Sequence, residues 1–408
     1  MLIVIANAHS IANPGDTAIV LGTIKLLREI HPEARITVVS RTAELDKKYY
    51  LSIDCNVISA TPNLEIFVKA NLFDRMFSVG KAFQSYSSLK KIIRKCDLVL
   101  LCGGGYFYSE RKITPGFSFM SNMIPLVLAS YHKKPIISMP QSCGPFKSFV
   151  AKRMFLYVMK HSKKIFSREA ISESYIEKTY GKMNTIPCPD MAFYLFRDDE
   201  NQIKAPIDRK KQFTIGVTVR KWGGGTNYIC EIVSAIKDIS LRHWIKVKII
   251  VQVRGPHEVD DDLESSKQLR DQLKEECKNI DIEMHVKHPT FSLEEIEELY
   301  SKCDLVLGMR FHSVIISLCR NVPALAIGYQ HKSQGILEYM DLAELYAGSY
   351  DNVISAEMVV KIEYIISNYE NIVTKIRRKV LEAKRLICQK VGYEIKNILS
   401  EHEKKNII

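Results

Sequence analysis

Short apolar runs, rich in β-branched residues, alternate with amphipathic helical patterns along most of the chain. The runs are LIVIANA (2–8), RITVVS (35–40), DLVLLC (97–102), KPIISMP (134–140), KKIFS (163–167), FTIGVTV (213–219), VKIIVQV (247–253), DLVLGM (304–309) and VPALAIG (322–328). Continuous apolar runs are typical of strands buried on both faces of a parallel sheet. Strands that alternate with helices indicate βαβ units. The pattern therefore predicts an α/β fold built on parallel sheets.

The two halves of the chain repeat one pattern. RKCDLVLLCGGG (Arg94–Gly105) is similar to SKCDLVLGMRFH (Ser301–His312), and each is followed by an apolar helical segment and a second strand with a glutamine at its end. The charged stretch Arg197–Gln212, which contains a proline, fits a linker. We therefore expect two doubly wound domains facing one another, 1–205 and 206–375. A C-terminal amphipathic helix, 376–408, can pack back on the first domain in folds of this kind.

Composition narrows the class of protein. The chain has 408 residues, which suits two domains, and its net charge of +12 favours anionic partners. No zinc-finger spacing or RNA-binding motif is present, so we expect no nucleic-acid partner. Ten cysteines without a C-x-x-C pair, and an N-terminus without a signal-peptide pattern, indicate a cytoplasmic protein with reduced thiols. The uncharged stretch Ile113–Tyr131 is interrupted by prolines and predicts a buried helix rather than a membrane span.

Glycines and polar or charged side chains gather where the predicted strands end. They are Asn13, Gly15, Asp16, Gly103, Gly104, Gly105, Gln141, Arg168, Arg220, Arg310, His312, Gln330, His331 and Lys332. Ligands of open α/β sheets bind beyond the carboxyl ends of the strands. Each residue also has a local explanation: Asp16 or Thr17 can cap a helix, glycines form turns, and arginines can be exposed charges. Together they favour a cleft for a phosphate- or carboxylate-bearing substrate, with no metal-ligand cluster and no Walker or dinucleotide motif.

The most specific candidate for a catalytic site is the stretch LVLGMRFHS (Leu305–Ser313). In an extended chain Arg310 and His312 share one face, and a helix that starts near Ser313 adds its N-terminal dipole beside them. The alternative is a surface arginine and a packed histidine. Imidazole changes charge near neutral pH, so His312 is the candidate acid or base of a site for an anion that also needs a proton. His9, His31, His132 and His288 are expected to have structural or surface roles.

These motifs resemble the polysaccharide pyruvyl transferases. The matching elements are NPGDTAI, DLVLLCGGG, QSCGPF, FSREAIS, CPDMAF, IGVTVR, SLEEIEELYSKCDLVLGMRFHS and ALAIGYQHKSQGILEYM, in that order from the N-terminus to the region of Tyr350. The resemblance implies two Rossmann-like domains in the style of GT-B glycosyltransferases. Two positions depart from the family pattern: Ile11 and Ala12 precede Asn13 where glycine is usual, and Phe311 stands where leucine is common.

The resemblance also implies a reaction. The family transfers the enolpyruvyl group of phosphoenolpyruvate to a sugar of a surface polysaccharide or its lipid-linked precursor, and a pyruvate ketal forms as phosphate leaves. His312 would then be the catalytic acid or base, while Arg168, Arg310 and Lys332 would bind the donor. Weaker candidates for substrate binding are Asn13, Gly15, Asp16, Gly103, Gly104, Gly105, Gln141, Arg220 and Gln330.

The expected partners are phosphoenolpyruvate as donor substrate, no cofactor, and a lipid-diphosphate-linked oligosaccharide as acceptor. The basic surplus is compatible with peripheral contact with an acidic membrane at the inner face of the plasma membrane. Two alternatives stay open: a GT-B glycosyltransferase that uses a nucleotide sugar, and a non-catalytic binding subunit of a glycan-assembly complex. The intact Gly308-x-Arg310-x-His312 element speaks against the second, because unused buried charges are costly.

Overall fold

The structure is a computed structural model that describes residues 1–60, 72–109, 112–181, 183–197, 211–221, 227–255, 261–286, 292–328 and 331–407. Two compact units are present. The first comprises Met1–Ile11, Ile19–Tyr194 and Arg385–Ile408, and the second comprises Ala12–Ala18 and Leu195–Lys384. The units change at 194/195 and 384/385, where the sequence suggested 205/206 and 375/376. Most of the expected linker, 198–210, lies outside the described residues.

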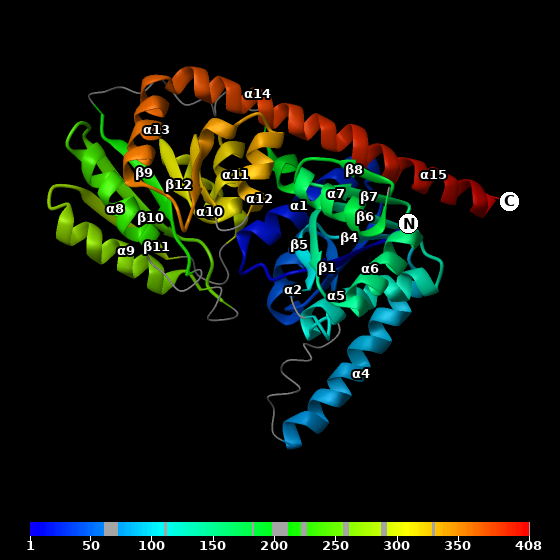
Figure 1. Cartoon of the computed structure of the whole chain (residues 1–408). Coiled ribbons are helices and arrows are strands. Elements are labelled where there is room, and N and C mark those ends of the chain that lie inside the picture. Colours follow the sequence, from blue (N-terminus) through cyan, green and yellow to red (C-terminus); the bar gives the residue numbers. More distant parts are fainter. Residues whose placement is uncertain are drawn as a thin grey trace. The chain divides into compact units, whose positions relative to one another are not determined.

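The first unit is built on a parallel sheet with helices packed against it (Figure 1). Its order within the described residues is β3 (Cys55–Ser59), β2 (Arg35–Ser40), β1 (Leu2–Ala8), β4 (Leu98–Leu101), β6 (Ile136–Phe146), β7 (Lys164–Ser167) and β8 (Thr185–Pro187), with β5 (Gly104–Ser109) beside β6. The helices are α1 (Pro14–Ile30), α2 (Ala43–Ser52), α4 (Leu72–Lys95), α5 (Phe117–Tyr131), α6 (Phe149–His161), α7 (Ala170–Tyr180) and the 3₁₀ turn η1 (Met191–Leu195).

The second unit repeats this plan. Its sheet order is β11 (Asp281–Val286), β10 (Ile245–Val251), β9 (Phe213–Thr218), β12 (Leu305–Gly308), β13 (Ala324–Gly328) and β14 (Tyr346–Ser349). The helices are α8 (Asn227–Ser240), α9 (Leu263–Glu276), α10 (Leu293–Ser301), α11 (Phe311–Cys319), α12 (His331–Tyr339), α13 (Ser355–Ser367) and α14 (Tyr369–Ile387), with a 3₁₀ turn η4 (Ala343–Leu345) before β14. Every strand pairing in both sheets is parallel.

The repeat seen in the sequence is therefore a repeat in topology. Strands β4 and β12 occupy equivalent places, each beside the first strand of its unit. Asp97 precedes β4 and accepts a hydrogen bond of 2.7 Å from Leu2 N. Asp304 precedes β12 and accepts one of 2.8 Å from Thr214 N. Both units have the doubly wound order in which ligands bind at the carboxyl edge, where the strand order reverses.

The apolar runs form the cores. Each of the nine runs named above contains an observed strand, and the central strands β4 and β12 are buried along their whole length. The stretch Ile113–Tyr131 contains α5, whose Met123, Leu126 and Ala129 are buried, so the expectation of a buried helix is confirmed. None of the described helices combines the length and the hydropathy that crossing a membrane requires.

The C-terminal segment belongs to the first unit. After α14, a short π-helical turn, η5 (Cys388–Gly392), leads into α15 (Tyr393–Ile407). Lys390 Nζ donates to the Pro187 carbonyl at 2.6 Å, and Glu394 forms an ion pair of 3.2 Å with Lys164. Ile395 and Leu399 are buried, so α15 contributes an apolar face to the packing of this unit.

Candidate functional site

The turn between β12 and α11 holds the Gly308-Met309-Arg310-Phe311-His312 element. The strand ends at Gly308, Arg310 occupies the N-cap position with extended backbone (φ −81°, ψ 120°), and the helix begins at Phe311. The helix thus starts two residues before Ser313, and His312 lies in its first turn. The expectation that Arg310 and His312 share one face of an extended chain is therefore wrong.

Gly308 lets the helix close onto the end of the strand. A Cβ at this position would lie 2.6 Å from Ser313 Oγ and 2.9 Å from Val314 Cγ2. Ser313 Oγ donates to the Arg310 carbonyl at 2.5 Å and lies 2.9 Å from Thr218 Oγ1 at the end of β9. The glycine and the serine therefore fix the backbone that carries Arg310 and His312.

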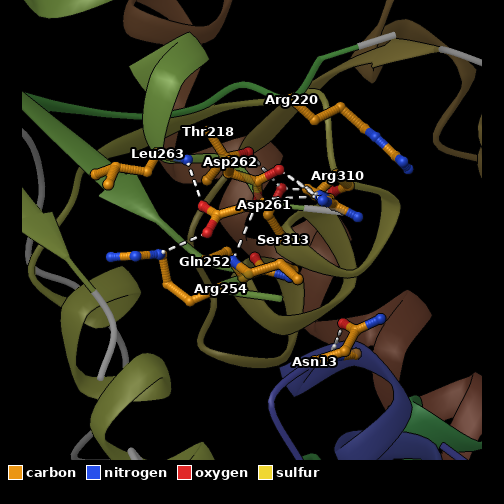
Figure 2. A network of polar contacts seen from close by, with 12 residues as sticks. Asn13, Thr218, Arg220, Gln252, Arg254, Asp261, Asp262, Leu263, Arg310 and Ser313 are labelled. Carbon is orange, nitrogen blue, oxygen red and sulfur yellow. Dashed lines mark hydrogen bonds and ion pairs between the residues drawn. The ribbon is translucent and has the colours of Figure 1, made fainter. Parts of the chain in front are cut away.

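Arg310 is held by a buried aspartate. Its Nε donates to both carboxylate oxygens of Asp262 at 3.1 and 3.0 Å, and its Nη2 donates to Oδ1 at 2.5 Å (Figure 2). Asp262 is 1% exposed, precedes α9, and accepts a further hydrogen bond of 3.2 Å from Val253 N. Burial raises the pKa of the Asp262 carboxyl, and the positive charges of Arg310 and Arg220 oppose that rise. The pair fixes the plane of the Arg310 guanidinium.

A second arginine and a second ion pair lie in the same network. Arg220 follows β9, is 6% exposed, and extends toward the same side of Figure 2 as Arg310. Its carbonyl accepts a hydrogen bond from the Tyr228 hydroxyl. Arg254 pairs with Asp261 at 3.0 Å. Arg254 and Arg310 each pair with one of two neighbouring aspartates, and Arg220 adds a third positive charge beside them.

The first turn of α1 packs against His312. Residues 12–18 group with the second unit, and a Cβ on Gly15 would lie 2.3 Å from His312 Nδ1 and 2.4 Å from Cγ. Asn13 supports this turn, because its Oδ1 accepts from Gly15 N at 3.1 Å and its Nδ2 donates to Asp16 Oδ2 at 2.7 Å. Asn13 therefore acts as a helix cap ahead of Pro14, while Gly15 gives the imidazole its place.

The first unit repeats the arrangement of a strand-end arginine on a buried aspartate. Arg168 follows β7, is 5% exposed, and donates from Nη1 to Asp190 Oδ2 at 2.5 Å and from Nε to Ser142 Oγ at 2.8 Å. Asp190 Oδ1 accepts from Ala192 N at 2.9 Å. The Gln141 carbonyl accepts from Arg168 N at 3.3 Å, so two predicted site residues meet at this edge. Arg168 is thus a buried, oriented charge and not an exposed one.

The triple glycine has a structural explanation. Gly104 and Gly105 open strand β5, which pairs with β6, so these two glycines lie in a strand and not in a turn. A Cβ on Gly103 would lie 2.5 Å from the Pro140 carbonyl. Gly104 has φ +128°, and a Cβ there would meet the Tyr106 ring at 2.5 Å. Both positions need glycine for packing.

One predicted donor-binding residue, Lys332, and one predicted substrate-binding residue, Gln330, lie wholly or partly outside the described residues. Gln330 lies outside the described residues, and Lys332 is described only by its backbone in the first turn of α12. Among the described residues, no group of three or more histidine, cysteine, aspartate and glutamate side chains is arranged to hold a metal ion.

The sequence predicts the two arginines but not the aspartates that pair with them. Asp262 is 48 residues from Arg310, and Asp190 is 22 residues from Arg168. Asp190 lies in the CPDMAF motif, which was a usable signal. Asp262 stands in an acidic run beside Asp261, and only the fold shows which of the two pairs with Arg310.

The fold is shared with sugar-nucleotide enzymes. The structure of UDP-GlcNAc 2-epimerase from Neisseria meningitidis bound to UDP-GlcNAc aligns over 96% of this chain and 100% of its own, with TM-score 0.55 and 11% identity. The spinosyn rhamnosyltransferase SpnG, complexed with thymidine diphosphate, aligns over 95% and 99%, with TM-score 0.51 and 9% identity. These likenesses confirm the GT-B-like fold class of two parallel-sheet α/β units.

Sequence comparison gives the family. The amylovoran biosynthesis protein AmsJ of Erwinia amylovora is 23% identical over 427 residues, which cover 97% of this chain and 99% of AmsJ. The family model described as polysaccharide pyruvyl transferase matches residues 13–331, from the Asn13 cap to the start of α12. The chain therefore belongs to the polysaccharide pyruvyl transferase family, whose members act as transferases in polysaccharide synthesis.

Proposed function

We propose that this protein transfers the pyruvyl group of phosphoenolpyruvate to a sugar of a surface polysaccharide or of its lipid-linked precursor. The observation that carries the proposal is the β12–α11 turn. It sets Arg310, oriented by the buried Asp262, two residues before His312, whose ring packs against Gly15. An oriented cation and a titratable imidazole in one turn suit a substrate that is anionic and must be protonated.

The arginines suit the donor. Phosphoenolpyruvate carries a carboxylate and a phosphate, and planar guanidinium groups bind such anions with paired hydrogen bonds. A guanidinium has five N–H donors, so an arginine oriented by one carboxylate can bind a second anion. Arg310 and Arg220 would bind the donor from the second unit. Arg168 and Lys332 are further candidates for this role.

His312 would supply and accept protons. The donor's methylene carbon takes a proton and becomes a methyl group, which leaves positive charge on the adjacent carbon. One sugar hydroxyl adds to that carbon and releases its proton. The bond between carbon and the phosphate oxygen then breaks, and a second hydroxyl adds and releases a proton to close the ketal. One released proton balances the methyl group, and the other leaves with phosphate.

The acceptor in this proposal is an oligosaccharide on a lipid diphosphate. The net charge of +12 would favour approach to such an anionic substrate and to an acidic membrane surface. No cofactor enters the proposed steps. A non-catalytic role fits less well, because buried paired charges at two strand ends are costly unless they serve a ligand.

A labelling experiment tests the reaction. The purified protein is incubated with phosphoenolpyruvate labelled with ¹³C at the methylene carbon, together with lipid-linked oligosaccharide from cells that lack the protein. We expect a labelled ketal methyl signal on the saccharide and an equal amount of free phosphate. Transfer of a sugar from a nucleotide sugar, with no label on the saccharide, would instead establish the glycosyltransferase alternative.

A further inference from the structure

A cavity of about 390 Å³ lies at the amino edge of the first sheet, and none of the candidate site residues lines it. Its lining is Cys96, Asp97, Ser130, His132, Lys133, Lys134, Pro135, His161, Lys163, Ile398, Glu401 and His402. Asp97, Pro135 and Lys163 directly precede β4, β6 and β7, and the C-terminal helix α15 closes one side. Lys163 and Arg168 stand at opposite ends of β7, about 16 Å apart at about 3.3 Å per residue.

The floor of the cavity carries two polar atoms that need a partner. Ser130 is 4% exposed, and neither its Oγ nor His132 Nε2 has a hydrogen-bond partner among the described residues. Buried polar groups in native structures are nearly always paired, with protein, water or ligand. A hydroxyl and an imidazole can both donate to one oxygen-rich group.

The charges around the cavity favour an anion. Lys133, Lys134 and Lys163 outnumber the two carboxylates, Asp97 and Glu401. Asp97 is already engaged, since it accepts from Leu2 N at 2.7 Å and pairs with His402 Nε2 at 3.3 Å.

The remaining groups add no negative charge. Burial raises the pKa of the Cys96 thiol to about 12, so it stays neutral near pH 7. The three histidines of the lining, His132, His161 and His402, carry no negative charge. Lys90 and Arg94 of α4 lower the pKa of His132 together with burial, so they also contribute positive potential here.

We propose that this cavity is a second anion site, which binds the phosphoryl group of a small phosphorylated molecule or of a lipid headgroup. Ser130 and His132 would donate to phosphoryl oxygens at the floor, and Lys134 and Lys163 would neutralise the charge at the rim. The size of the cavity is within the range of small-molecule sites. The site is independent of the proposed transfer reaction, because it lies at the opposite edge of the sheet.

The test is a titration with inorganic phosphate, read on the imidazole NMR signal of His132. The signal is assigned by its loss in His132→Gln, and it reports on this cavity alone. We expect a saturable shift. The double variant Lys134→Gln/Lys163→Gln should bind about tenfold more weakly, since each lost charge-assisted hydrogen bond weakens binding. Lys160→Gln/Lys178→Gln changes the net charge equally at two exposed lysines outside the cavity, and should bind as the wild type does.

The outcomes separate this site from the donor site. A His132 signal that does not move, or equal weakening in both double variants, would overturn the proposal. Arg310→Lys should leave the His132 titration unchanged whether or not the transfer reaction is confirmed. Sedimentation with vesicles of phosphatidylcholine and phosphatidic acid then identifies the source of the phosphoryl group. Binding that depends on Lys134 and Lys163 assigns a lipid headgroup, and absence of binding assigns a free phosphorylated molecule.

Discussion

At the scale of single residues, two arginines are each oriented by a buried aspartate. Arg310 and Arg168 each follow a strand, are nearly buried, and pair with an aspartate that is at most 1% exposed. Replacing a buried ion pair with apolar residues is often neutral or stabilising, so such pairs are poorly explained by stability alone. Their effect here is to hold a cation in one orientation at the carboxyl edge of a sheet.

Asp262→Asn keeps the shape of the side chain and removes its charge. We expect the free energy of unfolding to fall by about 3–5 kcal/mol, because Arg310 loses its buried counter-ion. Affinity for phosphoenolpyruvate should also fall, because the guanidinium is no longer fixed. Urea denaturation and calorimetry measure the two effects. The control is Asp271→Asn, whose exposed pair with Arg270 should contribute little to stability. Equal effects of the two substitutions would show that Asp262 does not orient Arg310.

His312→Gln keeps a polar side chain of similar size and removes the titratable ring. A positioned acid or base contributes about 10²–10⁴-fold to a rate, so kcat should fall by that factor. The release of phosphate from phosphoenolpyruvate in the presence of acceptor measures kcat. Affinity for phosphoenolpyruvate should change little, since Arg310 and Asp262 remain. A variant with the wild-type rate would remove His312 from the mechanism.

Gly15→Ala tests the contact between the first turn of α1 and the imidazole of His312. The added Cβ would lie 2.3 Å from His312 Nδ1, so the ring must move. We expect kcat to fall at least about tenfold, because a small displacement of an acid–base group is costly. Gly392→Ala is the matched control, since its Cβ would meet its nearest neighbour at an ordinary 3.5 Å. If both variants keep full activity, the position of His312 does not depend on Gly15.

At the scale of elements, the sequence predicted the buried strands and missed the edge strands. The nine continuous apolar runs all contain strands, because a strand buried on both faces must be apolar throughout. Strands β3, β8, β11 and β14 were not predicted. They lie at the edges of their sheets, and their residues are largely intermediate or exposed, so polar residues interrupt them or, in β8, the strand is only three residues long. β5 was missed because its glycines were interpreted as a turn.

The candidate site was predictable to the same limited extent. Arg168, Arg310 and His312 were predicted from their motifs and from their positions at strand ends. Both features are properties of the local sequence. The pairing of each arginine with its aspartate joins residues far apart in the chain, so no local pattern contains it. The helical position of His312 was missed because α11 begins directly after Arg310, with no capping side chain at that position to mark its start.

His132, which directly follows α5, should make the stability of the protein depend on pH. Burial and the neighbouring cations Arg94, Lys90 and Lys134 lower the pKa of His132, so the folded protein binds fewer protons there than the unfolded chain does. Stability should therefore fall as the pH drops below about 6.5, the ordinary histidine pKa. The test compares melting temperatures at pH 7.5 and 5.5, roughly one unit either side of that pKa. The melting temperature of the wild type should fall more over this range than that of His132→Gln. Parallel declines would contradict the assignment.

At the scale of the whole molecule, one plan is used twice. Both units have the same parallel strand order, and each presents an arginine held by a buried aspartate at its carboxyl edge. The chain also carries a net charge of +12. Oriented cations on a basic protein favour an anionic substrate, and phosphoenolpyruvate carries both a carboxylate and a phosphate. We therefore propose phosphoenolpyruvate as the donor.

The most direct test is the thermal stability of the purified protein with phosphoenolpyruvate and, separately, with UDP and GDP sugars. A ligand that binds only the folded state raises the free energy of unfolding, by about 2.7 kcal/mol at a hundredfold excess over its Kd. We predict a higher melting temperature with phosphoenolpyruvate alone, and loss of that increase in Arg310→Ala. An increase with a nucleotide sugar and none with phosphoenolpyruvate would contradict the proposed donor.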